Sequence, residues 1–228
     1  NHIYATAAAG KAYDFKTIGI IRGEEHDPLN ATLAFARDCG MQLHYVDRAQ
    51  YRQKNAAQYL NELKHQFGHV YVLPEGGSNP LALEGCKEII AEIAVPFNTI
   101  CCASGTGATL AGLISALRPD QSAIGFSALK GGSFLADEVK AFLQNKPSDA
   151  DWRIEDRFHF GGYAKINDEL IHFMKSFKTD YGITLDAVYT GKMFYGLFEL
   201  IKTGAFDRGC TIIAIHSGGL QGNKGFNL

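Results

Sequence analysis

The sequence predicts an α/β fold in which a mostly parallel sheet is covered by helices on both faces. Two observations carry this prediction. Strand-like and helix-like segments alternate almost throughout the 228 residues, and short polar or glycine-rich turns follow most of the strands. Strands that alternate with helices form βαβ units, and such units build parallel sheets. There is no internal repeat and no low-complexity tract.

The N-terminal third is expected to hold three strand–helix units after an Ala-rich first helix. Asn30 is a typical N-cap for one helix, and the Cys-Gly pair at 39–40 is a typical helix end. Apolar runs indicate the strands, and apolar residues at helical spacing indicate the helices. Helices are expected at 1–13, 30–38 and 51–67, and strands at 17–22, 42–46 and 70–73.

The rest of the chain continues the alternation. Pro119 ends one helix, and a polar patch at 146–151 separates two others. Helices are expected at 81–93, 109–117, 134–144, 167–181 and 193–202, and strands at 97–103, 122–126, 158–160, 185–189 and 211–216.

Composition excludes several classes of protein. With 46% apolar and 20% charged residues, the chain is globular and long enough for one large or two small domains. No apolar run approaches the roughly 20 residues that span a bilayer, so membrane insertion is not expected. A formal charge of -2 provides no basic footprint for nucleic acid.

The five cysteines are odd in number and lack the C-x-x-C spacing of redox or zinc motifs. Cys101 and Cys102 lie inside an apolar strand. This pattern is typical of reduced core thiols in a cytoplasmic protein, and no metal site is expected.

A Ser-Gly-Thr-Gly turn joins the strand at 97–103 to the helix at 109–117. Its glycines allow consecutive N–H groups to point inward, and the hydroxyls of Ser104, Thr106 and Thr109 add donors at a helix N-terminus. Such a loop suits a phosphate group. The alternative is that it is only a tight strand–helix connection.

The phosphate is not expected to belong to a nucleotide. The P-loop requires a Lys that this turn lacks. The dinucleotide fingerprint requires a third Gly where Leu110 stands, and an acidic residue after the next strand, where Ser127 and Ala128 stand. A small phosphate monoester held by the loop fits better.

Ligands of parallel sheets bind beyond the carboxyl ends of the strands. Small, hydroxyl-bearing and glycine-rich residues recur at these ends, as an enclosed small-molecule site requires. They occur at 23–25, 75–79, 104–109, 127, 189–192 and 216–219.

Three of these stretches together resemble a known family. They are Ser-Gly-Thr-Gly-Ala-Thr-Leu-Ala-Gly-Leu at 104–113, Leu-Asp-Ala-Val-Tyr-Thr-Gly-Lys at 185–192 and Ile-His-Ser-Gly-Gly-Leu at 215–220. Their order and sequence resemble the 1-aminocyclopropane-1-carboxylate (ACC) deaminase/D-cysteine desulfhydrase family of pyridoxal-phosphate enzymes, which has the tryptophan synthase beta-like fold, fold type II. The likeness covers nearly the whole chain.

The resemblance implies two three-layer α/β domains, a smaller one at 1–73 and a larger cofactor-binding one at 74–228, in a homodimer. It also implies roles for individual residues. Tyr189 and Tyr163 correspond to active-site phenols, and His2 and Ser217 to substrate-binding residues. Asn1, Gly105, Thr106, Gly107, Ala108, Thr109 and Thr190 correspond to residues that bind pyridoxal 5'-phosphate, with Thr190 facing the pyridine nitrogen.

Each role has a structural alternative. Tyr189 would then be an aromatic residue at a strand end, Thr190 an N-cap, and His216 a hydrogen-bonded core histidine. The family's Schiff-base lysine and an adjacent serine precede the Asn-His segment, so both are expected to lie outside this chain, which would begin inside the fold.

Position 190 favours one family chemistry. The resemblance implies Glu there in enzymes that open ACC, because a carboxylate keeps the pyridine nitrogen protonated and the ring a strong electron sink. A threonine provides a weaker sink, which suffices for a substrate with an α-proton and a thiolate leaving group. Ser217, a small residue, favours the same activity. We therefore expect β-elimination from D-cysteine, giving pyruvate, hydrogen sulfide and ammonia.

Three alternatives remain open at this point. An ACC deaminase or an amino-acid racemase would use the same fold and cofactor. A non-catalytic ligand-binding domain would follow if the full-length protein lacked the lysine.

Overall fold

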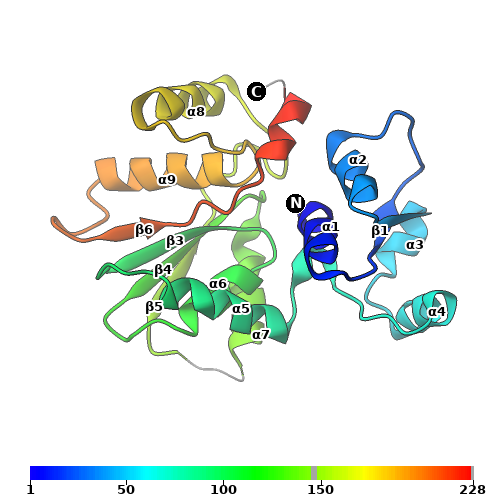
Figure 1. The fold of residues 1–228 in the computed structure, drawn as a ribbon. Coiled ribbons are helices and arrows are strands. Elements are labelled where there is room, and N and C mark those ends of the chain that lie inside the picture. Colours follow the sequence, from blue (N-terminus) through cyan, green and yellow to red (C-terminus); the bar gives the residue numbers. More distant parts are fainter. Residues whose placement is uncertain (145–147, 227–228) are drawn as a thin grey trace. The chain divides into compact units, whose positions relative to one another are not determined.

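The structure is a computed structural model that describes residues 1–144 and 148–226. The chain divides into two compact units, Asn1–Gly77 and Ser78–Leu228 (Figure 1). Both units combine parallel strands with helices, as predicted. Within the described residues no helix is long and apolar enough to cross a membrane.

The first unit is built around two parallel strands, β1 (Ile18–Arg22) and β2 (Gln42–Val46). On one face, apolar residues of α1 (His2–Tyr13) and α2 (Ala31–Asp38) pack with Met41 and Leu43. On the other face, the ring of His44 contacts Phe67 of α4 (Ala57–Phe67) edge-on at 5.2 Å. Leu43 and His44, which are neighbours in β2, thus face helices on opposite sides of the two strands.

Two details of the first unit differ from the sequence prediction. The segment expected as one helix at 51–67 holds two helices, α3 (Arg48–Arg52) and α4, with a turn at 53–55 between them. Asp47 accepts the N–H of Gln50, so α3 begins before residue 51. The strand expected at 70–73 does not form. Tyr71 and Leu73 are exposed, and β1 and β2 pair only with each other in the described residues. An apolar run becomes a strand only where a neighbouring backbone pairs with it.

The second unit contains a four-stranded, wholly parallel sheet in the order β5-β4-β3-β6. Its strands are β3 (Thr99–Ser104), β4 (Ser122–Ser127), β5 (Asp151–Glu155) and β6 (Ile212–Ala214). Its helices are α5 (Pro80–Ala91), α6 (Ala108–Ile114), α7 (Leu135–Leu143), α8 (Asp168–Tyr181) and α9 (Thr190–Lys202). This unit also has 3₁₀ turns at 132–134 and 220–226, and another at 75–77 ends the first unit.

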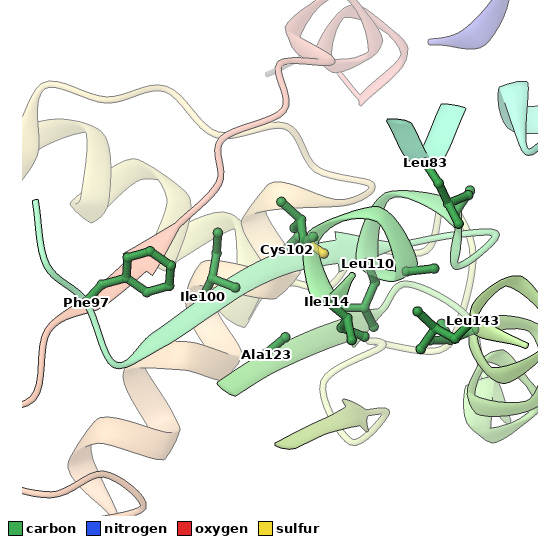
Figure 2. Close-up of a cluster of buried hydrophobic side chains, with 12 residues drawn as sticks. Leu83, Phe97, Ile100, Cys102, Leu110, Ile114, Ala123 and Leu143 are labelled. Carbon is green, nitrogen blue, oxygen red and sulfur yellow. The ribbon is translucent and has the colours of Figure 1, made fainter. Parts of the chain in front are cut away.

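Alternation along β3 and β4 sends apolar side chains to both faces of this sheet. Ile100, Cys102 and Ala123 pack against α5, α6 and α7, as Figure 2 shows. Cys101 and Ile124 pack on the opposite face against α9. The resulting helix–sheet–helix layers are visible in Figure 1 and confirm the predicted architecture.

The prediction for the second unit was wrong at two segments. The strand expected at 158–160 lies instead at 151–155, where Trp152 and Ile154 alternate with charged residues on the edge strand β5. The segment 185–189 is a loop and turn rather than a strand, because the side chain of Asp186 binds the backbone N–H groups that a strand would pair. Residues 146 and 147 of the predicted polar patch lie outside the described residues.

Candidate functional site

The loop after β3 has the geometry of an anion cradle. Gly107 precedes α6 with φ 84°, a left-handed conformation that favours glycine, and no side chain caps the helix. The first N–H groups of α6 therefore have no partner within the helix. Thr106 and Thr109 are exposed, and Ser78 donates a 2.6 Å hydrogen bond to the hydroxyl of Thr106. The predicted residues 105–109 are thus contiguous at one strand end.

Tyr189 lies directly against this loop. A Cβ atom at Gly105 would lie 3.1 Å from Cε1 and 3.2 Å from the hydroxyl oxygen of Tyr189, so a larger residue there would push the ring of Tyr189 aside. The ring of Tyr163 meets that of Tyr189 edge-on, with centroids 6.0 Å apart. Tyr163 is 59% exposed. The structure therefore brings the two predicted phenols together beside the loop.

Asp186 organises the turn that carries Tyr189. Its Oδ1 accepts the N–H groups of Val188 and Tyr189 at 3.0 and 2.9 Å. Its Oδ2 accepts both the N–H and the hydroxyl of Thr190 at 2.7 Å. The side chains of Asp186 and Thr190 are both buried. This carboxylate was not singled out from the sequence, although a capping Asp before a helix is a recognisable signal.

Thr190 has two hydrogen bonds within this turn. Besides donating to Asp186, its hydroxyl oxygen accepts the backbone N–H of Asp186 at 2.9 Å. The side chain therefore helps to hold the turn at the start of α9, which is a structural role. Its assignment to the pyridine nitrogen stays a prediction.

Ser217 is exposed and follows a histidine that holds the chain in place. The Nδ1 atom of His216 accepts the N–H of Gly218 at 3.1 Å. The proton of the ring is therefore on Nε2, which donates to the carbonyl oxygen of Thr184 at 2.8 Å. His216 is thus a hydrogen-bonded structural residue beside Ser217, whose role toward substrate stays a prediction.

Asn1 and His2 belong to the first unit. The carbonyl oxygen of Asn1 accepts the N–H of Ala5 in the first turn of α1. Burial lowers the pKa of His2, and its buried Nε2 has no hydrogen-bond partner within the described residues. Their assignments to cofactor and substrate stay predictions.

Two more buried polar residues near the Tyr189 turn were missed from the sequence. The ammonium of Lys192 donates to the carbonyl oxygen of Gly162 at 2.7 Å. The amide of Asn223 binds both sides of the turn, accepting from Ala187 and donating to Leu185. These partners are 30 to 38 residues away in sequence, so no local pattern indicates them.

No group of three or more His, Cys, Asp and Glu side chains within residues 1–144 and 148–226 could hold a metal ion.

Known families and proteins resemble this chain over most of its length. The family model described as pyridoxal-phosphate dependent enzyme matches residues 1–218. A Pyrococcus horikoshii protein provisionally named a 1-aminocyclopropane-1-carboxylate deaminase is 31% identical, over 97% of this chain and 71% of that protein. A mitochondrial bifunctional D-cysteine desulfhydrase/1-aminocyclopropane-1-carboxylate deaminase of Arabidopsis thaliana is 30% identical, over 97% of this chain and 62% of that protein.

Solved structures share the fold. The crystal structure of an ACC deaminase homologue superposes with a TM-score of 0.77 at 28% identity, covering 98% of this chain and 72% of that one. Serine racemase from Dictyostelium discoideum superposes with a TM-score of 0.63 at 14% identity, covering 96% of this chain and 73% of that one. The second likeness concerns the fold alone.

Proposed function

The chain belongs to the pyridoxal-phosphate dependent enzymes, in the ACC deaminase/D-cysteine desulfhydrase group, and on this premise we propose that it eliminates hydrogen sulfide from D-cysteine. Pyridoxal 5'-phosphate is the cofactor of this family. The products of the proposed reaction are pyruvate, hydrogen sulfide and ammonia.

The residues of the second unit fit this cofactor. A phosphate monoester requires several donors at close range, and the loop at 105–109 offers backbone N–H groups and the hydroxyls of Thr106 and Thr109. A Cβ at Gly105 would press on Tyr189, and one at Gly107 would lie 3.1 Å from Cγ2 of Val139. The two glycines therefore let the loop pack closely against Tyr189 and Val139.

Bound pyridoxal phosphate supplies an electron sink for negative charge that develops at the substrate Cα. The chain's own residues supply position and proton handling. Residues 105–109 would hold the phosphate, Tyr189 would contact cofactor or substrate beside the loop, and the phenol of Tyr163 would hold or donate a proton near the leaving sulfur. Ser217 would contact the substrate as a small hydroxyl-bearing residue.

The observation that carries the choice of substrate is the hydroxyl at position 190. Thr190 stands where the resemblance implies a carboxylate in ACC-opening enzymes, and a hydroxyl holds a proton on the pyridine nitrogen less well. D-Cysteine has an α-proton and a good leaving group, whereas ACC has no α-hydrogen. The weaker electron sink therefore suits D-cysteine better than ACC.

The experiment measures sulfide and pyruvate released by the full-length, pyridoxal-phosphate-loaded protein. D-Cysteine, L-cysteine and ACC are supplied in parallel. We expect sulfide and pyruvate from D-cysteine. Ammonia and 2-oxobutyrate from ACC, without sulfide from D-cysteine, would contradict the inference from Thr190. The protein would then be an ACC deaminase.

A matched pair of variants ties the activity to this site. Tyr163→Phe removes the exposed phenol beside Tyr189, whereas Tyr181→Phe makes the same change on an exposed ring of α8. We expect Tyr163→Phe to lower kcat/KM for D-cysteine about tenfold or more and Tyr181→Phe to leave it unchanged. Equal effects of the two variants would place the chemistry elsewhere.

A further inference from the structure

Lys192 is a buried cation that the proposed reaction does not use. It is the third residue of α9 and is 2% exposed. Burial lowers the pKa of its ammonium to about 8, although the negative charge of Asp186 acts to raise this pKa. A lysine is rarely buried in this way unless its donors are bound, so its partners indicate why it is there.

Those partners are two carbonyl groups in the connections that follow two neighbouring strands. The Nζ atom donates to the carbonyl oxygen of Gly162 at 2.7 Å and lies 3.5 Å from that of Ala128. Ala128 directly follows β4, and Gly162 follows β5 by seven residues. One ammonium therefore joins the connections that follow β4 and β5. Both connections lie beyond the carboxyl ends of the strands, where the candidate site lies.

The connection after β5 has an irregular backbone around the residue that Lys192 binds. Gly162 has φ 117°, and its carbonyl oxygen also accepts the N–H of Lys165, while its N–H donates to the carbonyl oxygen of His159. Tyr163 comes next in the chain, and its ring meets Tyr189 beside Gly105. Tyr163 thus directly follows the residue whose carbonyl group Lys192 binds.

We propose that Lys192 is a positioning residue of this site, whose ammonium holds the Gly162 carbonyl and thereby keeps Tyr163 against Tyr189. This inference rests on the proposed function for its kinetic consequence, but not for its structural one. Lys192 thus acts through Tyr163 and does not itself contact the reacting groups.

The structural test is hydrogen exchange in the full-length, cofactor-loaded protein with and without Lys192→Met. The substitution keeps the length of the side chain and removes its donors. We expect the amides of residues 159–165 to exchange about tenfold faster or more, because a hydrogen bond from a charged group is lost. Amides of β3 should change less than twofold. Equal acceleration in both segments, or none at 159–165, would overturn the proposal.

The kinetic test is a double-variant cycle on D-cysteine. Lys192→Met alone should lower kcat/KM about tenfold, and the same change made on a Tyr163→Ala background should have little further effect. A full tenfold loss on that background would show that Lys192 does not act through Tyr163. If the parent protein released no sulfide, the proposed function would fail, and the exchange result would still decide the positioning of residues 159–165.

Discussion

The hydroxyl of Thr190 and the carboxylate of Asp186 are joined by a 2.7 Å hydrogen bond in the interior of the second unit. The same carboxylate oxygen accepts the N–H of Thr190, and the other oxygen accepts two further N–H groups in the turn. One buried side chain therefore closes the turn that presents Tyr189 and starts α9. The fold of this turn and the position of Tyr189 therefore depend on the same carboxylate.

Replacing Asp186 with Asn should destabilise the protein. The amide has one acceptor oxygen in place of two, so at least one N–H of the turn faces an NH₂ group, and the charge of buried Lys192 loses its opposing partner. We expect the free energy of unfolding to fall by about 3 kcal/mol. Urea unfolding followed by far-UV circular dichroism measures it. Asp180→Asn, an exposed change on α8, is the control, and equal losses in the two variants would contradict this role.

Thr190 can be tested with a pair of substitutions that separate its hydroxyl from its shape. Thr190→Ser keeps the bonds to Asp186, whereas Thr190→Val removes one donor and one acceptor from a buried turn. We expect Val to lower the free energy of unfolding by roughly 1–3 kcal/mol and Ser by less than about 1 kcal/mol. If Thr190 also faces the pyridine nitrogen, Val alone should shift the visible absorption of the bound cofactor. The same spectrum in both variants would remove Thr190 from the cofactor site.

The loop at 105–109 could be predicted from the sequence because its residues are contiguous and follow an apolar strand. Tyr189 and Tyr163 required the resemblance to a family, since their contact joins two loops 26 residues apart. Lys192 and Asn223 were missed because they bind backbone groups distant in sequence. Asp186 was missed although its partners are only two to four residues away, because the segment 185–189 was predicted to be a strand rather than a capped turn. The bond from Lys192 to Gly162 spans 30 residues, and that to Ala128 spans 64.

The errors in secondary structure have a similar cause. Residues 70–73 have a strand-like composition, but no strand among residues 1–144 and 148–226 pairs with them. The sequence of β5 alternates apolar and charged residues, and it forms a strand because it pairs with β4. In both places tertiary pairing decides the outcome. The buried strands β3 and β4, which are apolar on both faces, were predicted to within two residues at each end.

Alanine at the two loop glycines should have different effects. Gly107→Ala places a Cβ at a left-handed residue and 3.1 Å from Val139, so we expect the free energy of unfolding to fall by about 1–2 kcal/mol. Gly105 has no such backbone constraint, but a Cβ there would displace the ring of Tyr189. We therefore expect Gly105→Ala mainly to weaken cofactor binding, about tenfold in a fluorescence titration. A larger stability loss for Gly105→Ala than for Gly107→Ala would contradict this distinction.

The five thiols should differ in reactivity toward iodoacetamide at pH 8. Burial raises the pKa of Cys101 and of Cys102 to about 12, and it also raises the pKa of half-buried Cys86. Because the thiolate is the nucleophile, Cys39 and Cys210 should react first, Cys86 more slowly, and the two buried residues only after unfolding. Peptide mapping by mass spectrometry gives each rate. Labelling of Cys101 at the rate of Cys39 would refute this order.

The charge of Lys192 should make stability depend on pH. Its pKa is about 8 in the folded chain, against an ordinary value of 10.5, because burial disfavours the ammonium. Between about pH 8 and 10.5 the unfolded chain therefore binds more protons at this residue, and its contribution to the free energy of unfolding rises with pH. Below about pH 8 both states are protonated, and the contribution is constant at its lowest value.

Other titratable groups make the free energy of unfolding fall with rising pH over part of the range from pH 8 to 10.5. A hydrogen bond to Glu169 raises the pKa of Tyr195 to about 12, and burial does the same for Cys101 and Cys102, so the folded chain keeps these protons longest and loses stability as pH rises. The measurement is therefore a difference. The free energy of unfolding of the parent minus that of Lys192→Met should rise from pH 7.5 to 10, with a slope of at most about 1.4 kcal/mol per pH unit. Lys175→Met, an exposed change on α8, is the control, and the free energy of unfolding of the parent minus that of this variant should not change with pH. If the difference for Lys192→Met were equally independent of pH, the ammonium of Lys192 would not be desolvated.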